Sequence, residues 1–303
     1  MSFDCEKPAG ALRHPSPRRW AARRLGSVVG VSGCPLMSED PSESVEFGPQ
    51  LDIRPHQGTV FRYAIFSQQR SGSGWLTTRL INLGAFGVPA EYLNPLVIPK
   101  FAERLHYPIH VSNNVARLNL KKYFEAVESV RTSSSGRFGV KIQPNQLFPL
   151  FNGDLAAATT FLRRYDALIV LTCRDKLRQA VSGTIAAVTG RWRPDEEPDL
   201  SGVNMEELVS KTAATLARYI DEDRIMSTIS RSTQRPMLCL TYEQMVADPD
   251  GTLEEILRFL GHKEGLSHLP KINALKVSDR RPGRVNAEVR QRFLDYIEGR
   301  ISN

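Results

Sequence analysis

The sequence lacks the features on which several classes of protein depend. Its 4 cysteines, Cys5, Cys34, Cys173 and Cys239, lie far apart and form no CxxC pair. They therefore indicate neither a zinc site nor a disulfide framework, and a reducing cytosol fits them best. No stretch approaches the roughly 20 apolar residues that a membrane-spanning helix requires. We expect a cytoplasmic protein that has no membrane span.

Basic residues outnumber acidic residues in the sequence. The 303 residues include 40 Lys and Arg against 33 Asp and Glu, which gives a net charge of +7. Such a field favours anionic partners, whether nucleic acid, anionic lipid or a phosphorylated small molecule. Beyond the N-terminal stretch the basic residues are not clustered with interleaved aromatic residues, so nucleic acid is not an expected partner. A non-catalytic protein that binds anions or nucleic acid stays open as an alternative.

The N-terminal stretch differs in composition from the rest of the chain, because Arg, Ser, Pro and Gly dominate it. We predict a poorly ordered tail over residues 1–55 and one domain over residues 56–303, since 41% hydrophobic residues suffice for a full core. Two other interpretations of the tail stay open. One is a signal or lipoprotein peptide that ends at Cys34, and the other is synthesis that starts at Met37.

Apolar patterns predict strands that alternate with helices from residue 60 onward. The predicted strands are 60–66, 138–142, 167–172 and 236–240, and the predicted helices are 75–83, 155–164, 174–189, 205–230 and 253–260. Such alternation is the signature of a parallel sheet with helices on both faces. We therefore predict an α/β fold with a P-loop-like parallel sheet flanked by helices.

A polar loop separates the first predicted strand from the helix after it, and it reads Ser67-Gln68-Gln69-Arg70-Ser71-Gly72-Ser73-Gly74. In such a turn, backbone N–H groups and the positive end of the helix dipole converge on one spot, where an oxyanion binds. Arg70 adds a planar cation, and Ser71 and Ser73 add hydroxyl donors. A lone Gly-Ser-Gly is more often an ordinary helix start, but the flanking elements and Arg70 favour anion binding.

The residues after this loop bear on the kind of anion. A nucleotide kinase or NTPase requires Gly-x-x-x-x-Gly-Lys-Ser/Thr. Here Trp75 and Leu76 follow Gly74, so the lysine that clamps phosphate and the hydroxyl that binds magnesium are both missing. The pattern argues against ATP hydrolysis, and a kinase with a degenerate P-loop stays as an alternative.

A second anion site is predicted at the end of the buried strand 167–172. Arg174 follows this strand, and Ser182 comes eight residues later. Eight residues are a little over two helical turns, so the guanidinium and the hydroxyl can face the same side. The alternative is that Arg174 and Asp175 only start the helix and Ser182 is an ordinary helical residue.

Together the two elements resemble the donor-binding loops of sulfotransferases. The resemblance extends to the bacterial family that contains trehalose 2-sulfotransferase and the nodulation-factor sulfotransferases, and it spans roughly residues 60 to 293. Supporting segments are 87–93, 139–141, 191–192, 240–245 and 276–281. It implies a sulfotransferase domain that moves a sulfuryl group from 3′-phosphoadenosine-5′-phosphosulfate, without a metal, to a hydroxyl of a carbohydrate, glycolipid or other small acceptor.

The resemblance also implies roles for individual residues. The implied donor-binding residues are Arg70, Ser71, Gly72, Ser73, Gly74 and Trp75 on the first loop, Arg174 and Ser182 at the 3′-phosphate, and Arg280 and Arg281 in a segment that covers the donor. Gly74 departs from the family pattern, where a threonine commonly helps to hold the phosphate. A homodimer is left open.

The acceptor hydroxyl needs a general base, and the resemblance implies Glu91; without the resemblance, Glu91 reads as a solvated glutamate at a helix start. Arg70 is the cation expected to neutralise charge on the leaving phosphate. Lys141, at the end of a predicted strand, is a candidate second cation near the transferred group, and an exposed lysine at a strand end is the equal alternative. We expect partial burial to raise the pKa of Glu91. His106 and His110 are the alternative bases.

Aromatic residues near these segments are candidates to line a sugar or an adenine. They are Tyr63, Trp75, Tyr92 and Trp192. Aromatic residues at such positions more often belong to the core.

Overall fold

Four short apolar segments form one parallel sheet in the order β2-β1-β3-β4. The computed structural model describes residues 45–53, 58–106, 119–192, 198–269, 275–276 and 283–299. The strands are β1 (Phe61–Ser67), β2 (Arg137–Ile142), β3 (Ala167–Thr172) and β4 (Met237–Thr241). All six residues of β3 are buried, as its continuous apolar sequence predicts for a strand covered on both faces. The predicted α/β class is confirmed.

The order of the strands creates a switch point at the carboxyl end of β1. The chain leaves β1 for β2 on one side, and then crosses to β3 on the other side of β1. In parallel sheets of this kind, ligands bind where the connections diverge, beyond the carboxyl ends of the strands. The pairing of Ser67 with Leu171 sets the ends of β1 and β3 level, so the loops that follow them start side by side.

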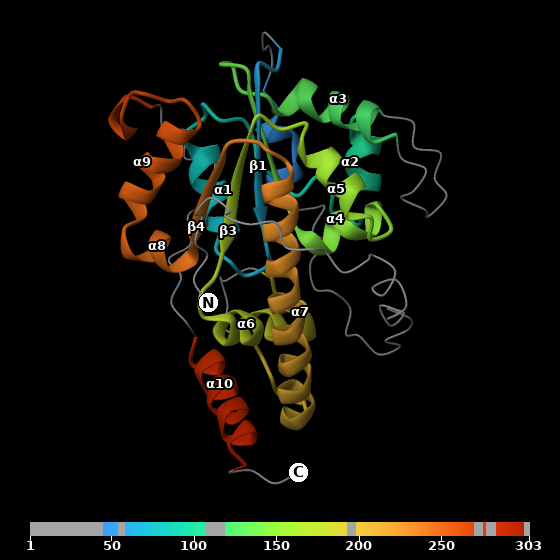
Figure 1. Ribbon diagram of the computed structural model, residues 1–303, viewed down its shortest axis with the longest axis vertical. Helices are drawn as coiled ribbons and strands as arrows, with labels where there is room; N and C mark the ends of the chain where they lie inside the picture. Colours follow the sequence, from blue (N-terminus) through green and yellow to red (C-terminus); the bar gives the residue numbers. More distant parts are fainter. Residues whose placement is uncertain are drawn as a thin grey trace, which may run out of the picture.

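Helices cover both faces of the sheet and fill the connections between strands (Figure 1). They are α1 (Ser73–Asn82), α2 (Ile98–Arg104), α3 (Leu120–Arg131), α4 (Pro144–Leu150), α5 (Leu155–Leu162), α6 (Lys176–Thr189), α7 (Met205–Ser232), α8 (Tyr242–Ala247), α9 (Pro249–Phe259) and α10 (Arg284–Ile297), with short 3-10 turns η3 (Val45–Phe47), η4 (Pro49–Leu51) and η6 (Leu266–His268). The helices predicted from the sequence are confirmed as α1, α5, α6, α7 and α9, with ends shifted by a few residues.

The two faces of the sheet support separate cores, because alternate residues of a strand point to opposite faces. On β1, Ala64 and Phe66 pack with α2, α3, α4 and α5. Tyr63 and Ile65 pack on the other face with α1, α8 and α9. The sheet is therefore the middle layer between two layers of helices, and this arrangement fixes the strand ends rigidly.

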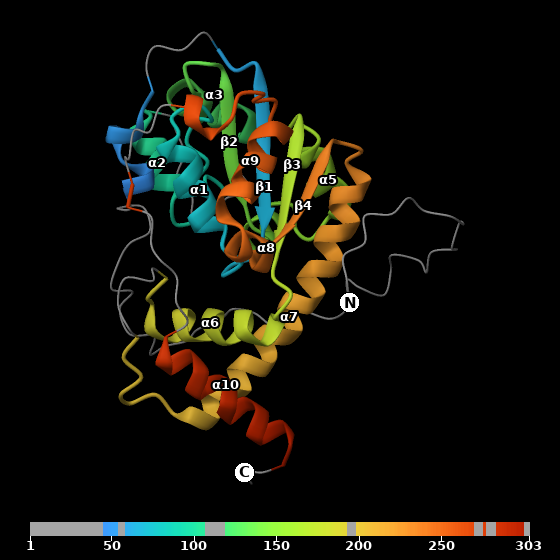
Figure 2. The ribbon, with the colours of Figure 1, turned by 90° about the vertical axis from the view of Figure 1, so that its left-hand side faces the viewer.

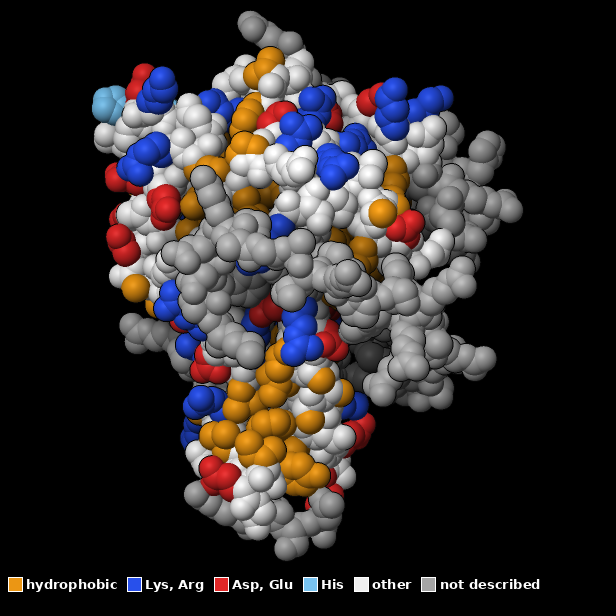
Figure 3. Space-filling model, in the orientation of Figure 1, with side chains coloured by type: hydrophobic (Ala, Val, Ile, Leu, Met, Phe, Trp, Pro, Cys, Tyr) orange, Lys and Arg blue, Asp and Glu red, His pale blue; other side chains and the backbone are white. Residues whose placement is uncertain are grey.

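A third group of helices lies beyond the carboxyl ends of the strands (Figure 2). Its core joins α6, α7 and α10 through Val181, Ile185, Leu208 and Val289, and hydrophobic side chains also gather on the face of this group that Figure 3 shows. In both ribbon views α6 lies across the end of the sheet, below the tip of β1. This group gives the site a floor opposite the strand ends. None of the helices within the described ranges is long and apolar enough to cross a membrane.

Residues 45–53, which fall within the predicted tail, pack on the domain. Phe47 and Leu51 are buried there, and the Asp52 carboxylate accepts hydrogen bonds from Arg104 at 2.8 and 3.1 Å. Residues 1–44 lie outside the described residues, so the tail stays a prediction.

Candidate active site

The loop after β1 takes a backbone shape that leaves the start of α1 open to a ligand. Arg70 and Gly72 have positive φ angles of 58° and 89°, and Gly72 caps α1 without a side-chain hydrogen bond. The first N–H groups of a helix have no partner within the helix, and such groups with the helix dipole form a ready anion site. The loop therefore has the geometry that its Gly- and Ser-rich sequence predicted.

The serines of this loop behave differently from the expectation. The Ser71 hydroxyl donates to the carbonyl oxygen of Gln68 at 2.7 Å and closes the turn, so its proton stabilises the loop instead of facing an anion. The Ser67 hydroxyl is buried and has no hydrogen-bond partner in the described part of the chain. A buried hydroxyl without a partner is uncommon. Ser67 is thus a candidate hydroxyl donor to a ligand. Ser73 is the first residue of α1, which begins two residues before the predicted start at Trp75.

The loop after β3 carries Arg174 at the start of α6. Asp175 caps this helix by accepting from the backbone N–H of Arg178 at 2.9 Å, as the alternative interpretation of this segment proposed. Arg174 is exposed, and its guanidinium forms no ion pair with any carboxylate of the described residues. An exposed guanidinium of this kind suits a phosphate group.

The two predicted anion elements meet directly. Arg70 Nε donates to the hydroxyl oxygen of Ser182 at 2.8 Å, and Arg70 Nη1 donates to the carbonyl oxygen of Trp192 at 2.6 Å. Ser182 lies on the second turn of α6, so one hydrogen bond joins the loop after β1 to the helix after β3. Residues more than one hundred positions apart in the sequence thus form one site at the switch point of the sheet.

A buried polar network that the sequence did not reveal fixes this junction. Lys176 Nζ donates to Gln68 Oε1 at 2.8 Å and pairs with Asp223 of α7 at 2.7 Å. Gln179 Nε2 donates to the carbonyl oxygen of Gln69 at 2.8 Å. Burial raises the pKa of Asp223, and the ammonium group of Lys176 opposes this. The network attaches the loop after β1 to α6 and α7. These contacts give the loop the rigidity that a binding site needs.

Glu91 and Lys141, predicted separately as catalytic residues, form an ion pair. Lys141 Nζ lies 2.6 Å from Glu91 Oε1, and the two side chains are 9% and 20% exposed. The backbone brings them together, because Ala90 forms a parallel bridge with Val140 and accepts from the N–H of Lys141 at 2.9 Å. Lys141 is therefore a nearly buried partner of Glu91, and its interpretation as an exposed residue at a strand end is wrong.

Two glutamines complete the surroundings of Glu91. Gln143 Nε2 donates to Glu91 Oε1 at 2.8 Å, and Gln146 Nε2 donates to Glu91 Oε2 at 2.6 Å. The side-chain carbonyl oxygens of Gln143 and Gln146 are buried without partners in the described structure. Both amides therefore orient the carboxylate, and both leave an acceptor atom available.

The expected rise in the pKa of Glu91 is wrong. Burial does oppose ionisation, but the charge of Lys141 and the hydrogen bonds from Lys141, Gln146 and Asn94 outweigh it and hold the pKa of Glu91 below its ordinary value. Glu91 is therefore an ionised carboxylate at neutral pH.

The other predicted residues are buried in the core, partly or fully exposed, or outside the described residues. Tyr63 and Tyr92 are fully buried, and their hydroxyls donate to backbone carbonyls at 2.9 and 2.6 Å, so both belong to the core. Trp75, on the first turn of α1, is partly buried against the core with Arg79 over its ring, while Trp192 is 38% exposed. His106 is exposed after α2. Arg280, Arg281 and His110 lie outside the described residues.

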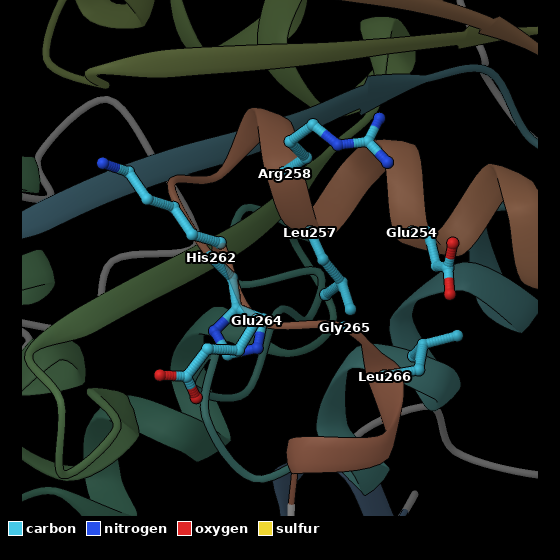
Figure 4. Close-up of a pocket in the computed structure, with 8 residues that line it drawn as sticks. Glu254, Leu257, Arg258, His262, Glu264, Gly265 and Leu266 are labelled. Carbon is cyan, nitrogen blue, oxygen red and sulfur yellow. The ribbon is translucent and has the colours of Figure 1, made fainter.

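A small pocket lies far from this site, at the end of α9 (Figure 4). It is lined by residues that include Leu257, Arg258 and His262. Gly261 beside it accepts a hydrogen bond from Arg137, the first residue of β2, so the pocket lies near the amino ends of the strands. Across the described ranges, no group of three or more His, Cys, Asp or Glu side chains is arranged to hold a metal ion.

The fold and the site define an α/β protein with a candidate anion site beyond the strand ends of a parallel sheet. The chain matches the family model described as "Stf0 sulphotransferase" over residues 62–293. It belongs to the Stf0 sulfotransferase family, which is named after trehalose 2-sulfotransferase. The protein is therefore a sulfotransferase, and the resemblance seen in the sequence is confirmed.

Among solved structures, the chain is similar to the "Sulfotransferase Domain from the Synechococcus PCC 7002 Olefin Synthase", with 16% sequence identity and a TM-score of 0.35. The alignment covers 80% of this chain and 98% of that domain. This likeness is too weak to support the assignment, which rests on the family match. No curated protein matches the sequence.

Proposed function

We propose that the enzyme transfers the sulfuryl group of 3′-phosphoadenosine-5′-phosphosulfate to a hydroxyl of a small acceptor, a carbohydrate or glycolipid. The observation that carries this proposal is the hydrogen bond from Arg70 to Ser182, which joins two anion elements into one site. A donor with phosphates at both the 5′ and 3′ positions requires two such elements at a fixed spacing. Membership of a sulfotransferase family supplies the class of reaction.

The donor site would divide between the two loops. Arg70, Gly72, Ser73 and the N–H groups at the start of α1 would hold the 5′-phosphosulfate, with Ser67 as an additional hydroxyl donor. Arg174 and Ser182 would hold the 3′-phosphate, since Arg174 is exposed and Ser182 already contacts Arg70. Arg280 and Arg281 stay predictions for the segment that covers the donor, as does Trp75 for the adenine.

The reaction would transfer one proton and one sulfuryl group. Glu91 would accept the proton of the acceptor hydroxyl, whose oxygen forms the new bond to sulfur as the bond between sulfur and the bridging phosphate oxygen breaks. Arg70 and the loop N–H groups would stabilise the negative charge that develops on the leaving phosphate. Lys141 pairs with Glu91 and favours its ionised form. It would also be a second cation near the transferred group.

A binding and transfer assay separates this function from its alternatives. The protein is incubated without metal with labelled 3′-phosphoadenosine-5′-phosphosulfate or with labelled ATP. Saturable binding of the sulfate donor supports the proposal, preference for ATP supports a degenerate kinase, and weak binding of both supports a non-catalytic protein. A cytoplasmic location, the carbohydrate acceptor and a homodimer stay predictions. Sulfated products compared between cells with and without the protein would identify the acceptor.

A further inference from the structure

The backbone of the loop after β3 is held by a carboxylate from the next strand connection. Glu243 Oε1 accepts from the N–H groups of Arg174 and Asp175 at 3.0 and 3.1 Å, and Glu243 Oε2 lies 3.1 Å from the Arg174 nitrogen. The thiol of Cys173 donates to the same carboxylate at 3.3 Å. Three consecutive residues of the loop therefore donate to one side chain.

The same short segment also contacts the first anion loop. A Cβ atom built at Gly72 would lie 2.7 Å from Met245 Cε and 2.8 Å from Tyr242 Cδ2, so these two side chains press directly on the loop after β1. Residues 242–245 thus contact one anion loop through apolar atoms and the other through a carboxylate. Within the described residues, this segment bridges the two loops from the outside.

Local structure keeps the bridging segment rigid. β4 pairs with β3 up to Thr241, and α8 begins at the next residue. Thr241 and Gln244 form a reciprocal capping box at the start of α8, with backbone to side-chain distances of 2.8 and 3.3 Å. The position of Glu243 on the first turn of α8 is therefore set by both the sheet and the cap.

Glu243 is ionised while it accepts hydrogen bonds from the loop after β3. Burial opposes ionisation, but the hydrogen bonds from the backbone of Arg174 and Asp175 outweigh it and hold the pKa of Glu243 below its ordinary value. Burial, together with Glu243, raises the pKa of the Cys173 thiol to about 12, so the thiol stays protonated and donates. An ionised carboxylate that accepts several hydrogen bonds is a strong anchor.

We propose that Glu243 is a positioning residue that holds Arg174 at the distance from the first loop which a 3′-phosphate requires. The inference rests on the proposed function, because the 3′-phosphate belongs to the proposed donor. Glu243 does not contact the ligand in this account. It fixes the backbone from which Arg174 reaches the 3′-phosphate, so it determines the preference for donors that carry this group.

The preference for ligands with a 3′-phosphate is the ratio of two affinities. Both are measured by calorimetric titration of the full chain, one with adenosine 3′,5′-bisphosphate and one with adenosine 5′-monophosphate. In Glu243→Gln one carboxylate oxygen becomes an NH₂ group that cannot accept from the backbone. We expect its affinity for the bisphosphate to fall about tenfold and its affinity for the monophosphate to stay within about twofold of wild type. Glu255→Gln, an exposed substitution on α9, is the matched control and leaves both affinities unchanged.

A second variant keeps the test informative if Glu243→Gln does not fold. Glu243→Asp keeps the charge but withdraws it by one methylene, and we expect a smaller loss that is again confined to the bisphosphate. An unchanged preference in a folded variant, or an equal loss for both ligands, overturns the positioning role. A wild-type protein that binds the two ligands equally overturns the proposed donor site itself, so the two failures are distinguishable.

Discussion

The proposed donor half and the proposed acceptor half of the site are built in different ways. In the donor half, the loop after β1 leads into the free N–H groups at the start of α1, and positive φ angles at Arg70 and Gly72 shape it. The loop after β3 contributes the exposed side chain of Arg174, because its own N–H groups donate to Glu243. In the acceptor half, the working groups are side chains from separate segments, with Glu91 held by Lys141, Gln143 and Gln146. The donor half therefore depends on local backbone conformation, and the acceptor half depends on tertiary contacts between side chains.

This difference has a chemical consequence. A donor with several phosphate oxygens is recognised by many fixed N–H donors, which a loop and a helix start provide in a short stretch. A general base instead needs a single carboxylate with a controlled orientation and pKa. Substitutions in the two halves should therefore separate binding of the donor from turnover.

The largest effect is expected for Glu91→Gln. The amide cannot accept the proton of the acceptor hydroxyl, so turnover should fall by about 10²–10⁴. Donor affinity should remain at the wild-type level, because Glu91 belongs to the acceptor half. Turnover and donor titration on the same preparation check both statements. Wild-type turnover in this variant would transfer the role of base to a histidine.

Arg70→Ala should affect both quantities. Loss of a preorganised donor at the leaving phosphate typically lowers the rate by about 10²–10³, and donor binding weakens because the bond to Ser182 is lost as well. Arg258→Ala, an exposed substitution beside the distant pocket, is the matched control. If Arg70→Ala lowered turnover while donor affinity stayed intact, the division into two halves would be wrong.

The pH dependence of kcat/KM tests the state of Glu91. Because the folded-state pKa of Glu91 lies below its ordinary value, the carboxylate is ionised at neutral pH, and activity should be lost only as the pH falls through this lowered pKa. In Lys141→Met burial remains and the cation is gone, so the acid limb should move towards neutral pH. Pairs of pH profiles for wild type and variant check this. An acid limb near pH ~6.5 in the wild type would indicate a histidine base.

The smallest effect concerns the backbone of the donor half. Gly72→Ala adds a Cβ at a φ of +89° and against Met245 and Tyr242, so the free energy of unfolding should fall by about 2–3 kcal/mol. Gly153→Ala is the matched control, since its φ is +77° and nothing lies within 4 Å of the added atom. Its cost should be about 1 kcal/mol, from the backbone alone. Denaturant titrations measure both losses. An equal loss of unfolding free energy in Gly72→Ala and Gly153→Ala would show that contact with residues 242–245 adds nothing to the cost at Gly72.

The sequence predicted the donor half better than the acceptor half, and the reason is physical. A strand, a Gly- and Ser-rich turn and a helix are local patterns, so β1, the loop and α1 were predictable. Gln143 and Gln146 have no distinctive chemistry alone, and their function depends on Glu91, which lies 52 and 55 residues away. The predicted rise in the pKa of Glu91 was wrong for the same reason. No local pattern in the sequence places Lys141 beside Glu91.

The same reasoning applies to the fold. The apolar run of β3 predicted a buried strand, whereas α4 has Pro149 inside it, and a proline within a helical pattern usually signals the end of a helix. α8 has 6 residues, too few for a helical periodicity to appear. No local pattern indicates a role for Glu243 in α8, because its contacts with the loop after β3 are tertiary.

The most direct test of the two-loop donor site is the affinity for 3′-phosphoadenosine-5′-phosphosulfate in the presence of a metal chelator. It is measured for wild type, Arg70→Ala, Arg174→Ala, the double variant and the control Arg258→Ala. We predict saturable binding in the wild type and control, a loss of about tenfold or more in each single variant, and a larger loss in the double variant. Wild-type affinity in both single variants would contradict the account.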